Sequence, residues 1–354
     1  MNSRQVYNET IQQIKPVSQV RISRAFQRLD SLTKPRRSLG YLEEIAARIV
    51  AILEEEHPVV AGKMVFVFVG DHKVVEEAVS AYPPEVTGLM VKNFLAGGAA
   101  INALARQAGS KVKVIDIGMM EDFGNLPGLL KHNIKRGADN IARGPAMSVT
   151  EAVRAISVGI QLAQEAASSD VTLMATGDMG IGNTTPASAL FSSFLRLPPV
   201  EMVGPGTGLD SAQIQHKVEI VEKALLINHA RCTGAIETLA ALGGMEIAGI
   251  CGLCLGAASC SRPVVIDGFI SSAAALAAIR IAPAVKDYLF FAHMSAEPGH
   301  RKFFIEQKIR PILDLGMRLG EGSGATIAMQ VIEDAVAVYN QMATFDDVGI
   351  TPGA

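Results

Sequence analysis

A single carboxylate stands among glycines near the C-terminal end of the chain, in the run Leu319-Gly320-Glu321-Gly322-Ser323-Gly324. Glycine permits positive φ and lets a ligand come close to the backbone, so this turn can aim one side chain. Apolar residues at helical spacing follow from Thr326 to Asn340, which places Glu321 beside the free N–H groups of a helix start. Two interpretations remain open: an acid aimed at a ligand, or a solvated carboxylate at the start of a helix.

Two glycine-rich stretches could hold a phosphate on backbone N–H groups: Gly180-Ile181-Gly182-Asn183-Thr184-Thr185, which follows a strand, and Gly204-Pro205-Gly206-Thr207-Gly208, which precedes a helix. Neither has the spacing of a dinucleotide-binding loop or of a Walker A loop. Lys217 lies one to two turns into the helix after the second stretch and could add a positive charge. Tight turns and a solvated lysine are the alternative interpretations.

Metal and nucleophile patterns are weak. The pair Cys251 and Cys254 has the spacing of zinc and redox sites, but it lies in an apolar helical stretch without a nearby histidine. Buried, inert thiols are therefore expected. His72, His293 and His300 do not have metal-ligand spacing, and no G-x-S-x-G motif is present. The sequence predicts no metal site and no cofactor.

Composition excludes other classes of function. The net charge is −3, aromatic residues make up 5% of the chain and tryptophan is absent, so a nucleic-acid partner is not expected. The first fifteen residues are polar and lack a signal-peptide core, and the long uncharged runs are interrupted by polar residues and proline. We therefore expect a cytoplasmic protein that does not enter a membrane.

The elements that must position these residues alternate between strands and helices. Strands are expected at Met64–Val69, Val112–Ile117, Val171–Ala175, Pro263–Ile266 and Leu289–Ala292, with helices between them, one of which covers Val86 to Gln107. This alternation predicts an α/β fold with a parallel sheet covered by helices on both faces. Polar residues with glycine follow every strand, so a ligand site is expected beyond the carboxyl ends of the strands.

Taken together, the motifs resemble the nicotinate-nucleotide:dimethylbenzimidazole phosphoribosyltransferases, which prepare the lower ligand of cobamides. The matching stretches run in order across nearly the whole chain: Leu32-Thr-Lys-Pro35, Gly70-Asp-His72, Val75-Glu-Glu77, Ser80-Ala-Tyr-Pro83, Glu85-Val-Thr87, Gly97-Gly-Ala-Ala-Ile-Asn102, Gly180-Ile-Gly-Asn-Thr-Thr185, Gly204-Pro-Gly-Thr-Gly208, Gly243-Gly-Met-Glu246, Asp267-Gly-Phe-Ile-Ser-Ser272, Ser295-Ala-Glu-Pro-Gly-His300 and Leu319-Gly-Glu-Gly322.

The resemblance implies transfer of phosphoribose from nicotinate mononucleotide to an aromatic base, with inversion at the ribosyl carbon and without a metal. Glu321 would be the general base, and Asp178 would stand where the family has a second acid, a glutamate. The residues implied at the phosphate and ribose are Gly180, Gly182, Asn183, Gly206, Gly208, Lys217 and Ser295. The residues implied at the base are Ser80, Tyr82, Leu89, Met90, Met179 and Leu319.

The resemblance also implies a domain organisation: a Rossmann-like α/β domain over residues 61–300, and a small helical domain made from residues 1–60 and 301–354. The family is usually dimeric, with each site completed by the partner chain. A homodimer, or a heterodimer with a related chain, is therefore expected.

Several residues depart from the family pattern, so the chemical class of the acceptor is not fixed by the resemblance. Asp178 is one methylene shorter than the usual glutamate, and Leu89 and Pro84 stand where glutamine is common. A less polar pocket would favour a phenol or cresol, the acceptors of relatives that work as pairs of related chains. Two further alternatives are a non-catalytic partner subunit and a nucleotide-binding oxidoreductase. The retained Glu321 argues against the first, and the missing G-x-G-x-x-G spacing against the second.

Overall fold

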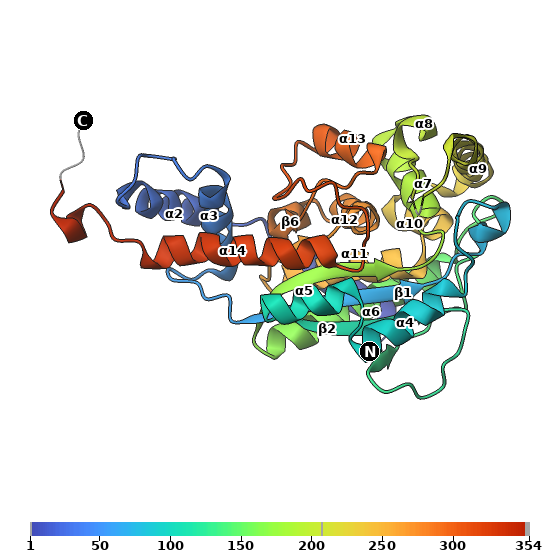
Figure 1. Ribbon diagram of the computed structural model, residues 1–354, viewed down its shortest axis with the longest axis horizontal. Coiled ribbons are helices and arrows are strands. Elements are labelled where there is room, and N and C mark those ends of the chain that lie inside the picture. The colour runs from blue at the N-terminus through green and yellow to red at the C-terminus, as the bar shows by residue number, and fades with distance from the viewer. Residues whose placement is uncertain (1, 207, 351–354) are drawn as a thin grey trace.

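The computed structural model describes residues 2–206 and 208–350 and has a parallel sheet at its centre (Figure 1). Six strands pair in the order β3-β2-β1-β4-β5-β6, and every pairing is parallel. The strands are β1 (Gly62–Gly70), β2 (Lys111–Gly118), β3 (Leu129–Lys131), β4 (Val171–Met179), β5 (Val264–Ile266) and β6 (Leu289–Phe291). The predicted α/β class is confirmed.

The order of the strands fixes where a ligand can bind. From β1 the chain moves outward to β2 and β3, then returns to place β4 on the other side of β1. The connections from β1 and β4 therefore diverge, and a crevice opens between the carboxyl ends of these two strands. In the β1–β4 register, Phe68 lies opposite Asp178 and Val69 opposite Met179, so Asp178 sits at this switch point.

Helices cover both faces of the sheet because its strands are apolar on both sides; Val65 to Val69 of β1 are all 0% exposed. One face is covered by α4, α5 and α14, and the other by α6 and α11, with α1 outside them. The helices are α1 (Ser3–Gln13), α2 (Gln19–Ser31), α3 (Tyr41–Leu53), α4 (Val86–Ala96), α5 (Ala100–Ala108), α6 (Val149–Ser168), α7 (Thr184–Leu195), α8 (Pro199–Met202), α9 (Ser211–Asn228), α10 (Ala235–Leu242), α11 (Met245–Ser259), α12 (Phe269–Ile281), α13 (Pro298–Gln307) and α14 (Ser323–Gln341).

A small helical unit extends from one end of the molecule, where α2 and α3 pack with the far half of α14 (Figure 1). The backbone joins the two chain ends there, since Leu32 forms an antiparallel bridge with Thr344. Lys34 and Glu43, both buried, form an ion pair of 2.8 Å inside this unit. Helix α1 does not join it and packs instead against α6 and α11.

The region from Val86 to Gln107 differs from the single helix that was expected. It forms two helices, α4 and α5, because the chain turns at Gly97, whose φ of +79° ends α4. By length and composition alone, residues 86–108 are apolar enough to cross a membrane, which the sequence did not predict. The break at Gly97 and the packing of both helices against the sheet show instead that they form a layer covering the sheet. Strand β3 and helices α7, α8, α10 and α13 were also not predicted.

Candidate active site

A cavity of about 480 Å³ opens at the carboxyl edge of the sheet, beyond β1, β4, β5 and β6. It brings together segments far apart in the sequence, as a switch-point site does. The residues lining it are Val79, Ser80, Tyr82, Val86, Met90, Asp178, Met179, Gly180, Ile181, Gly182, Asn183, Thr184, Gly206, Gly268, Phe269, Ile270, His293, Ser295, Glu297, Arg318, Leu319, Gly320 and Glu321.

Glu321 lines this cavity and is held by an unusual backbone. Its φ is +65°, and the flanking Gly320 and Gly322 have φ values of +85° and +88°. A non-glycine residue with positive φ is uncommon, and such strain is concentrated at functional sites. The side chain is 5% exposed and its Oε2 accepts a hydrogen bond from the Ile101 N–H at 3.4 Å. Burial raises the pKa of Glu321, and the nearby Asp267 carboxylate raises it further.

Asp267 anchors the turn that carries Glu321. This buried carboxylate follows β5, and it accepts hydrogen bonds from the Gly322 N–H at 3.2 Å and the Ala325 N–H at 2.8 Å. It therefore caps the N-terminus of α14 from another part of the chain. Burial raises the pKa of Asp267, while His293 and these N–H groups lower it. The sequence placed Asp267 at a strand end but did not identify this anchoring contact.

Asp178 is the second acid of the cavity and is 5% exposed. Its Oδ2 accepts a hydrogen bond from Asn183 Nδ2 at 3.0 Å, and its Oδ1 accepts one from Ser271 Oγ at 3.5 Å. Burial raises the pKa of Asp178 to about 8, and the neighbouring carboxyl groups of Asp267 and Glu246 add to the increase. This carboxyl therefore holds its proton at neutral pH.

The predicted phosphate residues divide into two groups. Gly180, Gly182, Asn183, Gly206 and Ser295 line the cavity, whereas Gly208 and Lys217 do not. Lys217 is 0% exposed and lies beneath the second glycine-rich stretch, where its Nζ donates to Thr184 Oγ1 at 2.7 Å and to the Gly204 carbonyl at 3.4 Å. Burial lowers its pKa to about 8, and Glu297 partly opposes this.

Glu297 and Arg318 line the cavity beside Gly206 but were not assigned to the site from the sequence. Glu297 is 4% exposed and its Oε1 accepts the Gly206 N–H at 2.9 Å, a donor that the sequence assigned to the phosphate. Arg318 donates to the Gly206 carbonyl at 3.3 Å and is the single Lys or Arg among the described residues that line the cavity. Its position immediately before Leu319 was the available signal for it.

Ser295 is positioned by a buried histidine. The ring of His300, which is 0% exposed, accepts the Ser295 N–H at Nδ1 at 2.9 Å and contacts Ser272 Oγ through Nε2 at the same distance. Burial lowers the pKa of His300 well below its usual value, which keeps Nδ1 free to accept. Another buried pair, His72 and Glu246, lies beside Gly180 with 2.7 Å between Nε2 and Oε1.

The predicted base residues also divide. Ser80, Tyr82, Met90, Met179 and Leu319 line the cavity. Leu89 does not: it is 61% exposed on the outer surface of α4, so the expectation that it faces the base does not hold within this chain. Helical geometry explains the difference, because Leu89 and Met90 are about 100° apart around the helix axis.

Cys251 and Cys254 are both 0% exposed within α11, and burial raises the pKa of each thiol. Among the described residues, no group of three or more His, Cys, Asp or Glu side chains could hold a metal ion.

An open parallel sheet with paired acids and glycine-rich turns at its switch point is the architecture of an α/β enzyme that takes a nucleotide-like ligand. The chain belongs to the phosphoribosyltransferase family whose model matches residues 14–350. It is 51% identical to the nicotinate-nucleotide–dimethylbenzimidazole phosphoribosyltransferase of Chlorobaculum tepidum over 345 residues, covering 98% of each chain. It is 49% identical to the enzyme of the same name from Geobacter sulfurreducens, with the same coverage.

A solved structure has the same fold. The crystal structure of CobT from Thermus thermophilus matches with a TM-score of 0.89 and 44% identity, covering 94% of this chain and 99% of that one. The predicted family is therefore confirmed.

Proposed function

We propose that this chain transfers phosphoribose from nicotinate mononucleotide to an aromatic base of the dimethylbenzimidazole type, releasing nicotinate and forming an α-ribotide for cobamide biosynthesis. The observation that carries the proposal is the placement of Glu321 and Asp178 in one cavity at the switch point. The turn that carries Glu321 lies against Asp178, since a Cβ on Gly320 would lie 3.4 Å from Asp178 Oδ2. Family membership and the names of the relatives support the substrate class.

Glu321 acts as the general base in this proposal. The unprotonated ring nitrogen of the acceptor attacks the ribosyl carbon from the face opposite nicotinate, so the configuration inverts. The glycosidic bond breaks with its electron pair going to the pyridinium nitrogen, which becomes neutral nicotinate nitrogen. The N–H proton of the acceptor passes to the Glu321 carboxylate. A raised pKa suits this role, because a base is most effective when its pKa approaches the working pH.

Asp178 stabilises the positive charge that develops on the sugar as the glycosidic bond breaks. Burial raises the pKa of Asp178 and favours the protonated carboxyl. A bound pyridinium cation would lower the pKa of Asp178, because a nearby positive charge favours the ionised form. Substrate binding would thus convert Asp178 into the carboxylate that the reaction needs.

The phosphate binds at the opposite end of the cavity from the base. Gly180, Gly206 and Ser295 line the cavity there, and Arg318 supplies a guanidinium. The Gly206 N–H is bonded to Glu297 and the Ser295 N–H to His300, so a phosphate would have to displace these acceptors to use either donor. Lys217 adds positive charge from beneath Gly206, although it does not line the cavity.

The dimer, the location and the domain boundaries complete the proposal. Tyr82 and Leu319 line the cavity but are 52% and 57% exposed, so one edge of the base side is open within a single chain. A second copy of the chain, or a related chain, would close this edge. The proposed location is the cytoplasm. The small domain is proposed to consist of α2, α3 and α14, which pack together. Helix α1, within residues 1–60, packs instead on α6 and α11, and α13, most of which lies within residues 301–354, packs on α7 and α8, so the expected boundaries are too wide.

The test is to incubate the purified chain with nicotinate mononucleotide and a panel of bases, then identify the products by mass and chromatography. We expect nicotinate and an α-ribotide in equal amounts with benzimidazoles, and a turnover lowered by roughly 10²–10⁴ with Glu321→Gln. Binding of the nucleotide without ribotide formation from any base would contradict the proposal.

A further inference from the structure

Two consecutive residues of α4, Thr87 and Gly88, touch different neighbours and fix this helix from two sides. Both are buried, while Val86 and Met90 of the same helix line the base side of the cavity. The position of α4 therefore sets the width of the space in which an acceptor ring must fit.

Thr87 connects α4 to the first glycine-rich turn. Its side chain is 0% exposed, and its Oγ1 accepts a hydrogen bond from the Ile181 N–H at 3.1 Å. Ile181 lies between Gly180 and Gly182 and lines the cavity. The Thr87 hydroxyl also helps to lower the pKa of Asp71, which burial raises. One buried side chain thus links two walls of the cavity.

Gly88 contacts a loop on the outer side of α4. A Cβ on Gly88 would lie 2.7 Å from Phe123 Cζ and 2.7 Å from Glu121 Oε2, so these side chains press against the helix backbone. The Phe123 ring is covered by Lys92 of the same helix, with Nζ 4.6 Å from the ring centre. Phe123 therefore limits how far α4 can move away from the cavity.

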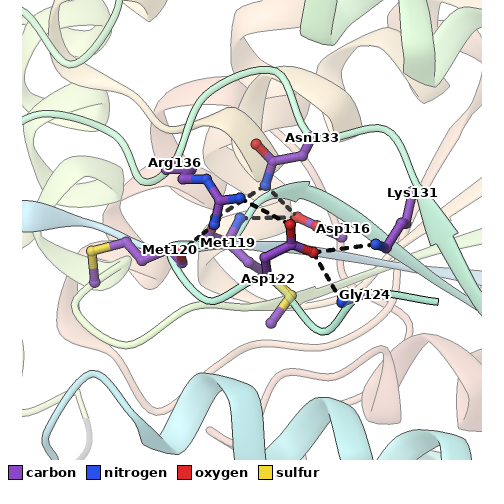
Figure 2. A network of polar contacts seen from close by, with 8 residues as sticks. All are labelled: Asp116, Met119, Met120, Asp122, Gly124, Lys131, Asn133 and Arg136. Carbon is purple, nitrogen blue, oxygen red and sulfur yellow. Dashed lines mark hydrogen bonds and ion pairs between the residues drawn. The ribbon is translucent and has the colours of Figure 1, made fainter. Parts of the chain in front are cut away.

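The loop that carries Phe123 is held by a network of polar contacts (Figure 2). Asp122 accepts from Lys131 at 3.2 Å and from Arg136 at 3.0 Å. Asp116 accepts from the Met119 N–H and from Asn133. The loop is also tied to β1, because the Met120 N–H donates to Asp71 Oδ2 at 2.8 Å. This network makes the loop a fixed support behind α4.

We propose that Thr87 is a positioning residue for the acceptor and that Phe123 is its support, so that together they set the width of the pocket for a flat, fused-ring base. The inference rests on the proposed function, since it names the feature of that site that selects the acceptor. Neither residue touches the reacting atoms in this proposal.

The first test replaces Thr87 with valine, which keeps the shape but removes the acceptor of the Ile181 N–H. We expect the KM for dimethylbenzimidazole to rise about tenfold while kcat stays within about threefold and the KM for nicotinate mononucleotide changes less. Thr87→Ser should restore the acceptor KM, and Thr10→Val, a change at another buried threonine, should leave it unaltered. An unchanged acceptor KM in Thr87→Val, or no restoration by serine, would overturn the proposal.

The second test changes the other side of α4. Gly88→Ala should push the helix toward the cavity and reduce kcat/KM for dimethylbenzimidazole about tenfold more than for the single-ring acceptor imidazole. Adding Phe123→Leu should restore the ratio. An unaltered ratio in Gly88→Ala would refute the role of Phe123.

Hydrogen exchange separates this inference from the proposed function. Exchange of the Ile181 amide should be slow in the parent, faster in Thr87→Val and slow again in Thr87→Ser, and this readout needs no turnover. A parent chain that forms no ribotide contradicts the proposed function, whereas equal Ile181 exchange in all three proteins overturns the role of Thr87.

Discussion

Replacing Asp178 with asparagine is expected to stabilise the fold increasingly as the pH rises. The folded chain keeps the Asp178 proton up to a pKa of about 8, whereas the usual value is 3.8. Between these values the folded state binds more protons than the unfolded state, so the parent loses stability with rising pH. Asparagine does not ionise, and its side chain can keep both contacts: the amide oxygen accepts from Asn183 and the amide nitrogen donates to Ser271.

The size of this effect follows from linkage. At about 1.4 kcal/mol per pH unit, the advantage of Asp178→Asn over the parent in free energy of unfolding should grow by up to about 4 kcal/mol from pH 5 to pH 8. Urea unfolding at four pH values measures it directly. The control is Asp347→Asn, because hydrogen bonds from Thr344 lower the pKa of that exposed carboxyl and its contribution should be constant over this range. A difference between Asp178→Asn and the parent that varies by less than about 1 kcal/mol would refute the protonated Asp178.

Three further predictions concern the reaction. Glu321→Gln should lower turnover by roughly 10²–10⁴ and leave nucleotide binding nearly intact; turnover within about threefold of the parent would exclude Glu321 as the base. Gly206→Val or Ser295→Asp should weaken binding of nicotinate mononucleotide in calorimetry, because bulk or negative charge blocks the phosphate, and binding of the free base should stay unaltered. When dimethylbenzimidazole and phenol compete at equal concentrations, more product should form from dimethylbenzimidazole. The ratio of the two products should be the same in Leu89→Gln, because Leu89 does not line the cavity. An excess of the phenol product would contradict the assigned acceptor.

Much of the fold could be predicted because the strands carry a strong signal. The run Met64–Val69 is apolar on both faces, which identifies a central strand, and polar residues with glycine follow it. Glu321 was predicted as a site residue from an equally local signal, because glycines on both sides of a single acid indicate an unusual backbone. Its positive φ confirms this unusual backbone, while its catalytic role remains a prediction.

Contacts between distant segments could not be predicted. Asp267 caps α14 across more than fifty residues of sequence, and Glu297 takes the Gly206 N–H because α13 begins beside that turn. Lys217 illustrates the same limit: helical spacing placed it near the phosphate stretch, but only packing shows that it lies beneath the turn. The position of Leu89 could not be predicted because it depends on how α4 is rotated about its axis, and in the structure α4 directs Thr87 toward Ile181.

Helix α14 connects the small helical unit to the turn that carries Glu321, so a movement of that unit would shift Glu321. Its 19 residues begin two positions after Glu321 and end where Thr33 donates to the Ala343 carbonyl and Phe345 donates to that of Ser31. At about 1.5 Å per residue the helix is about 28 Å long, so a tilt of about 4° at its far end would displace its start by about 2 Å. A shift of about 1 Å in a reacting group can cost about a hundredfold in rate. Fusions or truncations beyond α14 are therefore expected to move Glu321, the proposed general base, at the other end of this helix.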